Sequence, residues 1–178
     1  MKQSGAELIP SALVRLLTVG VYGSDGAAFF AALEAAGADI LLDIRTRRAV
    51  RGTRYSYANA KRLIAELGRR GIAYRHVIGL APGRELLALQ HGVDKREGHA
   101  YSARTVLAKT YVHRYIRDVL DRFDVAELAR ELAGYRAPVL MCVERIPAAC
   151  HRSLVAPRLA QALHARRITD LIPNAPPA

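Results

Sequence analysis

The stretch LLTVGVYGSDGAAFFAALEAAGADILLDI, residues 16–44, determines the fold that we expect. It starts with an apolar run rich in β-forming residues, 16–22, which predicts a buried strand. Ser24 is expected to cap the helix that follows, and Gly37 is expected to end that helix. Residues 40–44 are again mostly apolar and predict a second strand. The stretch therefore predicts one strand–helix–strand unit.

The same alternation continues along the chain. Ser56 is expected to cap a second helix, because apolar residues recur behind it at helical spacing. Residues 79–104 show no regular pattern, so a long loop is expected there. The other expected elements are strands at 72–77 and 137–142, helices at about 104–123, 124–134 and 148–165, and a short edge strand at 166–172. This order predicts an α/β fold with an open, mostly parallel sheet and helices on both faces, a Rossmann-like three-layer architecture.

Length and composition agree with one globular domain. The chain has 178 residues, of which 51% are hydrophobic, and a domain usually has roughly 100–200 residues. We expect a flexible arm at 1–14, a single α/β domain at 15–172 and a Pro-rich tail at 173–178. No apolar run reaches the roughly 18 residues of a membrane-spanning helix, and the N-terminus does not look like a signal peptide. A cytoplasmic protein without a membrane partner is therefore expected.

The net charge is strongly positive, at +11, from 27 Lys and Arg against 16 Asp and Glu. Two interpretations are open. A GC-rich genome encodes Arg freely, in which case the charge says nothing about function. Alternatively, the protein meets phosphates, which the planar guanidinium binds well.

Ligands of open α/β sheets bind beyond the carboxyl ends of the strands, and three segments of this chain are expected there. The first segment is 20–25, which contains Gly20 and Ser24 and leads into a helix. Its backbone N–H groups are candidates for binding an anion, although many strand–helix turns look like this one.

The second segment follows the predicted strand at 40–44. Asp43 stands at its end as a candidate general base, metal ligand or partner of a nearby Arg. Residues 45–54 hold five Arg, and two Tyr follow directly. Arg interleaved with aromatic residues suits a nucleic acid, through phosphate contacts and base stacking, and a solvated basic loop is the alternative. The candidate phosphate-binding residues here are Arg45, Arg51, Arg54, Tyr55 and Tyr57.

The third segment, CVERIPAACHR, runs from Cys142 to Arg152. Glu144 is a candidate acid–base group, and Arg152 is a candidate phosphate ligand. Cys150 is a candidate nucleophile, because His151, an Arg and a helix N-terminus would lower the pKa of its thiol. We expect the side chains of this segment and those of Asp43 and Arg45 to converge on one cleft.

Cys142, Cys150 and His151 are also candidate metal ligands. Their spacing is not that of a common zinc site, which usually has four ligands. The fourth ligand would have to be His76, His91, His99 or Asp43. Cys142 is alternatively a buried strand residue, as free Cys often is. We expect no cofactor and keep a metal ion as the alternative.

Four motifs resemble those of the family called domain of unknown function 488. The resemblance covers roughly 16–165, and the last motif is quite specific. Val21 and Tyr22 stand where many members have a His, so this chain departs from the family there. The resemblance implies the fold and the place of the site, and it implies no activity. The motifs are Thr18-Val-Gly20, Asp43-Ile-Arg45, Gly71-Ile-Ala-Tyr-Arg-His76 and the segment from Cys142 to Arg152.

The leading hypothesis is an enzyme, of hydrolase or base-processing type, that acts on DNA, RNA or a nucleotide. Asp43 and Glu144 would do acid–base work, and His151 would act as an acid or base or as an orienting donor. One alternative is a sulfurtransferase or phosphatase with Cys150 as nucleophile. Another alternative is a non-enzymatic nucleic-acid-binding module, in which the 45–54 Arg cluster is needed and the Cys–His pair is dispensable.

Overall fold

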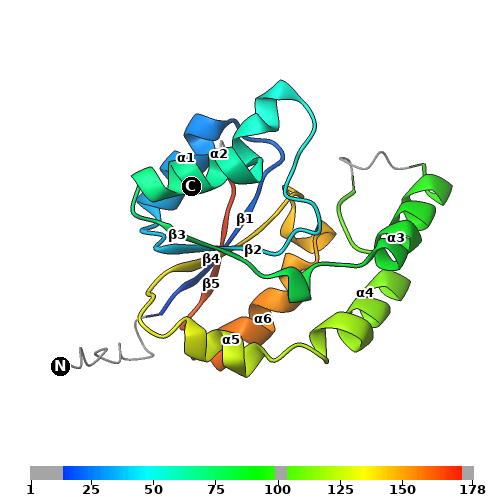
Figure 1. Cartoon of the computed structure of the whole chain (residues 1–178). Helices are drawn as coiled ribbons and strands as arrows, with labels where there is room; N and C mark the ends of the chain where they lie inside the picture. Colours follow the sequence, from blue (N-terminus) through cyan, green and yellow to red (C-terminus); the bar gives the residue numbers. More distant parts are fainter. Residues whose placement is uncertain (1–13, 99–103, 174–178) are drawn as a thin grey trace.

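The computed structural model describes residues 14–98 and 104–173. Its centre is a five-stranded sheet in which every pairing is parallel, in the order β3-β2-β4-β1-β5 (Figure 1). The expected open α/β sheet is therefore confirmed. The strands are β1 (Leu16–Gly20), β2 (Ile40–Asp43), β3 (Ala73–His76), β4 (Pro138–Cys142) and β5 (Ile168–Leu171).

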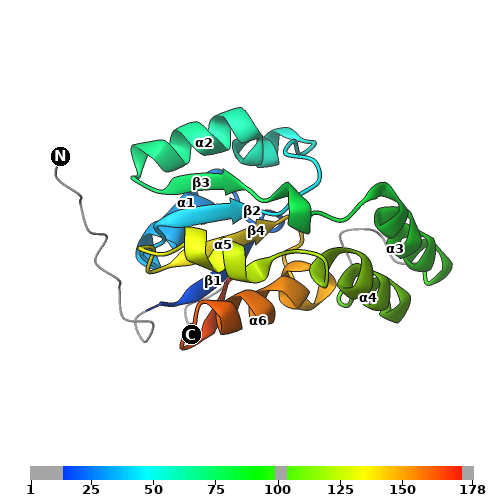
Figure 2. The ribbon, with the colours of Figure 1, turned by 60° about the horizontal axis from the view of Figure 1, so that its bottom comes forward.

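Helices α1 (Gly26–Ala35) and α2 (Ala60–Arg69) cover one face of the sheet (Figures 1 and 2). Alternate strand residues point to this side, because the side chains of a strand alternate between the two faces of its sheet. Val139 and Met141 of β4 therefore pack against this layer. The helices contribute the buried apolar residues Phe29, Phe30, Leu33, Leu63 and Leu67.

The opposite face is covered by α4 (Lys109–Tyr115), α5 (Val125–Glu131) and α6 (Arg152–Ala162). The intervening strand residues, such as Leu140 and Cys142, point to this second layer. Two layers of helices around the sheet give the three-layer architecture. The helix α3 (Arg84–Arg96) packs on α4 and lies beyond the carboxyl ends of the strands (Figure 2).

The expected long loop at 79–104 is wrong over half of its length, because Arg84–Arg96 form α3. The buried residues of α3 recur every four positions, as in any amphipathic helix, but two of the three are polar. Gln90 donates a hydrogen bond to Asp94 at 2.7 Å, so this polar helical face is satisfied inside the protein. Apolar periodicity alone could not reveal such a helix.

Both expected serine caps are wrong. Asp25 caps α1 and accepts a hydrogen bond from the backbone N–H of Ala28, while Ser24 is completely buried. Around Ser56 the chain forms a short 3-10 helix, Thr53–Ala58, and Asn59 occupies the N-cap position of α2. In both places the true helix begins after the expected cap.

The remaining expectations hold with shifted boundaries. The helix expected from about 104 starts at Lys109 and continues as a π-helical turn, Ile116–Leu120. A 3-10 turn, Pro147–Ala149, precedes α6. The expected edge strand is β5, which pairs with β1 at one edge of the sheet. Most of the expected arm at 1–14 and of the tail at 173–178 lies outside the described residues. Among the described helices, none has the length and apolarity to cross a membrane.

Candidate active site

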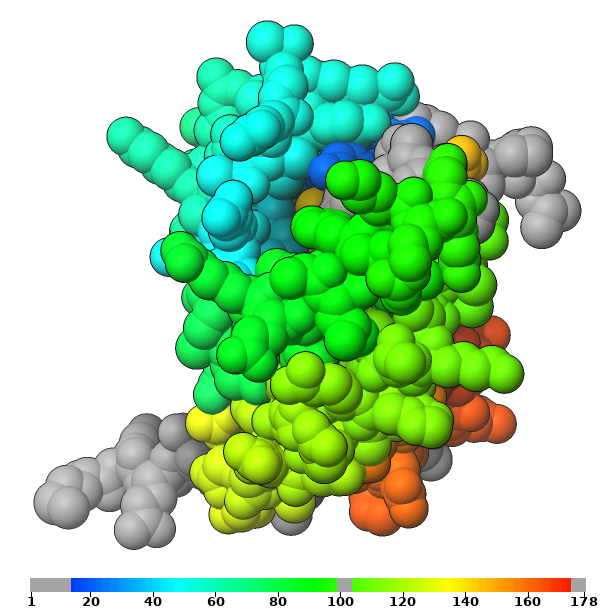
Figure 3. All heavy atoms as spheres, turned by 90° about the vertical axis from the view of Figure 1, so that its right-hand side faces the viewer, coloured from blue at the N-terminus to red at the C-terminus, as the bar shows by residue number. Residues whose placement is uncertain are grey.

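A cavity of about 910 Å³ lies at the carboxyl ends of the strands. Its walls are the segment that follows β2, the helix α3 and the segment that follows β4. In Figure 3 the hollow opens between the cyan segment after β2 and the green α3, with blue and gold atoms at its floor. The sheet order explains this meeting, because β4 lies between β2 and β1, so the segments after all three strands share one end of the sheet.

The cavity has a cationic lining. Six basic side chains line it, against two carboxylates, and both carboxylates are bonded to one of the six. The lining therefore attracts anions. The basic residues are Arg45, Arg47, Arg51, Arg84, Lys95 and Arg104, and the acidic ones are Asp94 and Glu144.

Arg45 lines the cavity, and Asp43 holds its guanidinium in place. The guanidinium donates from Nε to Oδ1 of Asp43 at 2.8 Å and from Nη2 to Oδ2 at 2.7 Å. The carboxylate also accepts the backbone N–H of Arg45 at 3.1 Å and the hydroxyl of Tyr74 at 2.9 Å. Asp43 is completely buried and Arg45 is 2% exposed. The pair therefore fixes the guanidinium in one orientation.

One nitrogen of that guanidinium has no hydrogen-bond partner in the described part of the chain. Nη1 of Arg45 is buried and makes no hydrogen bond with the described residues, although Arg45 lines the cavity. Buried donors are paired in the great majority of cases, so an unpaired one in a cavity wall indicates the place of a ligand atom.

Two side chains of β3 support this arrangement from the next strand. Besides the Tyr74 hydroxyl, the ring of His76 makes a 2.9 Å hydrogen bond with the backbone carbonyl of Arg45. Burial raises the pKa of Tyr74, so its hydroxyl stays a donor to Asp43. His76, considered above as a fourth metal ligand, is instead bonded to the main chain.

Arg104 is a site residue that sequence reasoning missed. Its guanidinium binds Asp94 at 2.8 Å, Glu144 at 3.0 Å and the backbone carbonyl of Ala149 at 3.2 Å. It thereby ties α3 to the segment after β4. Nothing in the sequence around Arg104 distinguishes it from the other arginines, because its partners are 10 and 40 residues away.

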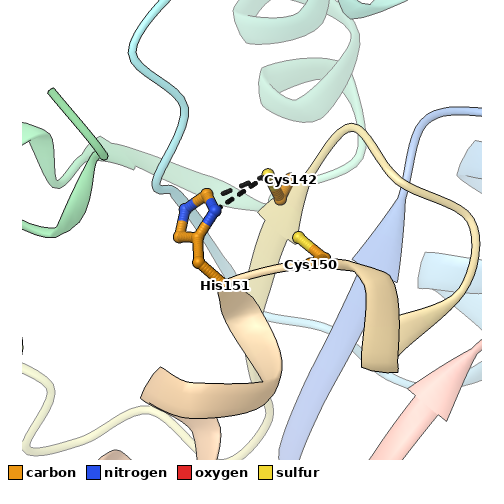
Figure 4. Close-up of side chains that lie close together, drawn as sticks. All are labelled: Cys142, Cys150 and His151. Atoms are coloured by element: carbon orange, nitrogen blue, oxygen red, sulfur yellow. Dashed lines mark hydrogen bonds between the residues drawn. The ribbon is translucent and has the colours of Figure 1, made fainter. Parts of the chain in front are cut away.

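Two cysteines and a histidine meet at the floor of the cavity (Figure 4). Sγ of Cys142 lies 3.7 Å from Nδ1 and 4.0 Å from Nε2 of His151. Nε2 of His151 also lies 3.1 Å from the backbone carbonyl of Ile44, to which it donates. All three side chains are buried, at 2–6% exposed.

The two thiols differ in acidity. A hydrogen bond to Cys150, together with burial, raises the pKa of Cys142 well above its ordinary value. Burial alone would raise the pKa of Cys150, but the hydrogen bond from Cys142 and the charges of His151 and Arg152 outweigh it. The pKa of Cys150 therefore lies well below its ordinary value, and Cys150 is the thiol of the pair that ionises first.

Arg152, a candidate phosphate ligand by sequence, does not line the cavity. It is completely buried, and its three nitrogens donate to Oγ1 of Thr18 and to the backbone carbonyls of Glu144 and Arg145. It fixes the segment after β4 against β1 instead. Each of these nitrogens already has an acceptor inside the protein, and Arg152 does not line the cavity, so its role is structural.

Three further sequence candidates are also structural. A Cβ on Gly20 would lie 1.9 Å from the backbone oxygen of Glu144, so Gly20 permits a close approach of two chain segments. The Ser24 hydroxyl donates to the carbonyl of Val21 and pairs with the buried hydroxyl of Tyr57. None of the three lines the cavity.

The rest of the basic loop is exposed. Arg51 lines the cavity, whereas Arg54 is exposed and lies over the ring of Tyr55 at 5.7 Å. Tyr55 in turn packs on Tyr22, a lining residue, with ring centroids 5.2 Å apart. The structure therefore places Arg54 and Tyr55 next to a lining residue without making them part of the wall.

The family model described as Domain of unknown function DUF488 matches residues 26–159, which is most of the chain. The chain belongs to this family. No curated protein and no solved structure matched in the other two comparisons. The matched range contains the two walls of the cavity that follow β2 and β4.

Two thiols and an imidazole at the floor of the cavity form a donor set that suits a metal ion. One ligand atom from each of Cys142, Cys150 and His151 can be chosen so that all three lie within 4.8 Å of one another. Because Nε2 of His151 donates to the backbone carbonyl of Ile44, Nδ1 is the ring nitrogen that could bind a metal ion. The same three groups can alternatively act as a thiol and its base.

Proposed function

We propose that this protein is an enzyme that acts on a nucleic acid or a nucleotide, and that a phosphate of the substrate binds Arg45 in the cavity. The observation that carries the proposal is the buried Nη1 of Arg45, which has no partner among the described residues and belongs to a cationic wall. Hydrogen bonds from a guanidinium to phosphate oxygens are among the strongest in proteins.

The dimensions and lining of the cavity favour a nucleotide unit over a bare anion. Its volume, about 910 Å³, falls in the range of roughly 300–1,000 Å³ that is usual for small-molecule sites. Arg47 and Arg51 are exposed lining residues, suited to further phosphates of a strand. Tyr22 and Tyr111 also line the cavity and offer aromatic surface to a base.

Within this proposal the two candidate carboxylates take different roles. Glu144 lines the cavity and is the acid–base group. Asp43 does not line it, and both of its oxygens accept hydrogen bonds from Arg45. Asp43 is therefore a positioning residue, which orients the guanidinium for the phosphate.

The test is the binding of a fluorescent, 5′-phosphorylated single-stranded oligonucleotide at several salt concentrations, followed by fluorescence anisotropy. Replacing Arg45 alone would leave Asp43 buried without its partner, so the test uses the double variant Asp43→Asn/Arg45→Gln, which removes both charges of the pair. We expect about a ten- to hundredfold loss of affinity, because a charge-assisted hydrogen bond is worth about 1.5–3 kcal/mol.

Arg122→Gln is the matched control, because Arg122 is exposed and does not line the cavity. It should change affinity less than about twofold. Equal affinity of the double variant and the wild type, with both folded, contradicts the proposed phosphate site. The enzymatic part is tested by incubating wild-type protein with single- and double-stranded DNA and RNA and with nucleoside phosphates, with mass-spectrometric detection of products. Tight binding without any product across this panel indicates the binding module instead.

A further inference from the structure

We propose that Cys142, Cys150 and His151 form a site for a transition-metal ion of the zinc class, with three protein ligands and a fourth position open to the cavity. The proposal goes beyond the phosphate site, because it rests on these three side chains alone. The two proposals can therefore fail independently.

The first argument is convergence. Cys142 ends β4, whereas Cys150 and His151 immediately precede α6, so the chain has to turn through seven intervening residues to bring them together. Their ligand atoms nevertheless all lie within 4.8 Å of one another. In tetrahedral sites the bonds to zinc are about 2.0–2.3 Å, which places neighbouring ligand atoms within such a distance.

The second argument is the orientation of the imidazole. Nε2 of His151 is 3.1 Å from the backbone carbonyl of Ile44. An imidazole that donates from Nε2 keeps the lone pair of Nδ1, which lies 3.7 Å from Sγ of Cys142. Metal-binding histidines almost always donate their other N–H to a carbonyl or a carboxylate in this way.

The third argument is the chemistry of the donors. Two sulfurs and an imidazole nitrogen suit zinc and other soft or borderline ions, whereas magnesium and calcium require oxygen ligands. The cysteines bind such an ion as thiolates, so two thiol protons leave to solvent. The nearby carboxylates of Asp94 and Glu144 each form an ion pair with Arg104 and are not counted among the proposed ligands.

The fourth argument is access. All three residues line the cavity, so an ion bound by them faces the space that Arg45 and Glu144 also line. Sites with three protein ligands and one open position are typical of catalytic zinc, which makes a bound water acidic. A structural site would instead be closed by a fourth residue. Of the four candidates for that place, His76 and Asp43 are bonded to Arg45, and His91 lines the cavity but does not belong to the cluster of ligand atoms. His99 lies outside the described residues.

The experiment is a cobalt titration of the full chain after metal is removed with a chelator. Co²⁺ bound by thiolates in a tetrahedral site gives sulfur-to-cobalt charge-transfer absorption and intense visible bands. We expect both, at one ion per chain, and their loss when Zn²⁺ is added. Cys150→Ser and His151→Gln should each weaken binding by at least about tenfold, because each removes one of three ligands. His113→Gln is the matched control, since His113 is exposed on α4.

A second measurement uses unchanged protein, in case a variant does not fold. X-ray absorption of the zinc-loaded wild type should show two sulfur neighbours and at least one nitrogen neighbour. Oxygen and nitrogen neighbours alone, or a cobalt spectrum without charge-transfer bands, contradict the site. So does alkylation of Cys150 by iodoacetamide at the same rate with and without excess Zn²⁺, which would identify a free thiol and favour the thiol enzyme.

Discussion

Replacing Arg152 distinguishes a scaffold residue from a phosphate ligand. The variant Arg152→Met keeps the unbranched stem of the side chain but removes its hydrogen-bond donors. In the structure these donors serve the backbone carbonyls of Glu144 and Arg145 and the hydroxyl of Thr18. The side chain is completely buried, so water cannot take over as donor without a local opening of the structure.

The expected cost follows from the two main-chain contacts. A hydrogen bond to a charged group contributes about 1.5–3 kcal/mol, so losing both corresponds to about 3–6 kcal/mol. The desolvation cost of the buried guanidinium disappears in the variant, which places the net effect near the lower end. Since domains are stable by about 5–15 kcal/mol, the variant should remain folded but be strongly destabilised.

Urea unfolding followed by circular dichroism measures this cost, with Arg158→Met as the control on the same helix. Arg158 is 43% exposed and pairs with Asp121 at the surface, so its replacement should cost about 0–1 kcal/mol. The reasoning is refuted if Arg152→Met stays within about 1 kcal/mol of the wild type while phosphate affinity falls about tenfold. That result would make Arg152 a ligand-binding residue.

Three further predictions concern the neighbouring structure. Gly20→Ala should destabilise by about 1–3 kcal/mol or more, since its Cβ meets the backbone oxygen of Glu144, and an unchanged melting temperature would contradict this. Asp43→Asn should cost about 3–5 kcal/mol in urea unfolding, because it leaves the guanidinium of Arg45 buried without its counter-ion, and a loss below about 1 kcal/mol would contradict the paired arrangement. Burial raises the pKa of Tyr57 to about 12 from 10.0, so its contribution to stability is complete below pH 10 and is lost as the pH rises to about 12. Between these pH values the free energy of unfolding in urea should fall less for Tyr57→Phe than for the wild type. An equal fall in both proteins would refute the prediction.

The strands were predictable because their side chains obey one simple rule. In the inner strands of a parallel sheet covered on both faces every position is buried, so β1, β2 and β4 are nearly continuous apolar runs. The edge strands β3 and β5 are less buried. The segments that follow neighbouring parallel strands also lie at one end of the sheet, as expected. The sequence pattern alone therefore predicted that Asp43 and Cys142 lie at the same end of the sheet.

The helices were less predictable wherever polar groups are satisfied inside the protein. The buried face of α3 contains Gln90 and Asp94, which are bonded to each other, and Asp94 is also bonded to Arg104. Such a face looks like a loop in sequence because its partners come from other segments. The same reason concealed Arg104, whose role depends entirely on long-range contacts.

The roles of the site residues depended on geometry that composition cannot supply. Arg45 and Arg152 are both arginines next to strand ends. Arg45 has a buried nitrogen without a partner among the described residues, whereas all three nitrogens of Arg152 are hydrogen-bonded. Asp43 and Glu144 are both carboxylates, yet only Glu144 lines the cavity. Residue types predicted where a site would lie, whereas burial and hydrogen bonding decide which side chains line the cavity.

The most direct test of the proposed phosphate site is a crystal structure of the wild-type protein soaked with a nucleoside 5′-monophosphate. The account predicts that the phosphate lies in the cavity, with one oxygen within about 2.7–3.2 Å of Nη1 of Arg45. Further contacts are expected from the basic lining, for example from Arg51. A nucleotide bound only on the exposed surface around Arg54, with Nη1 of Arg45 still unpaired, would contradict the account.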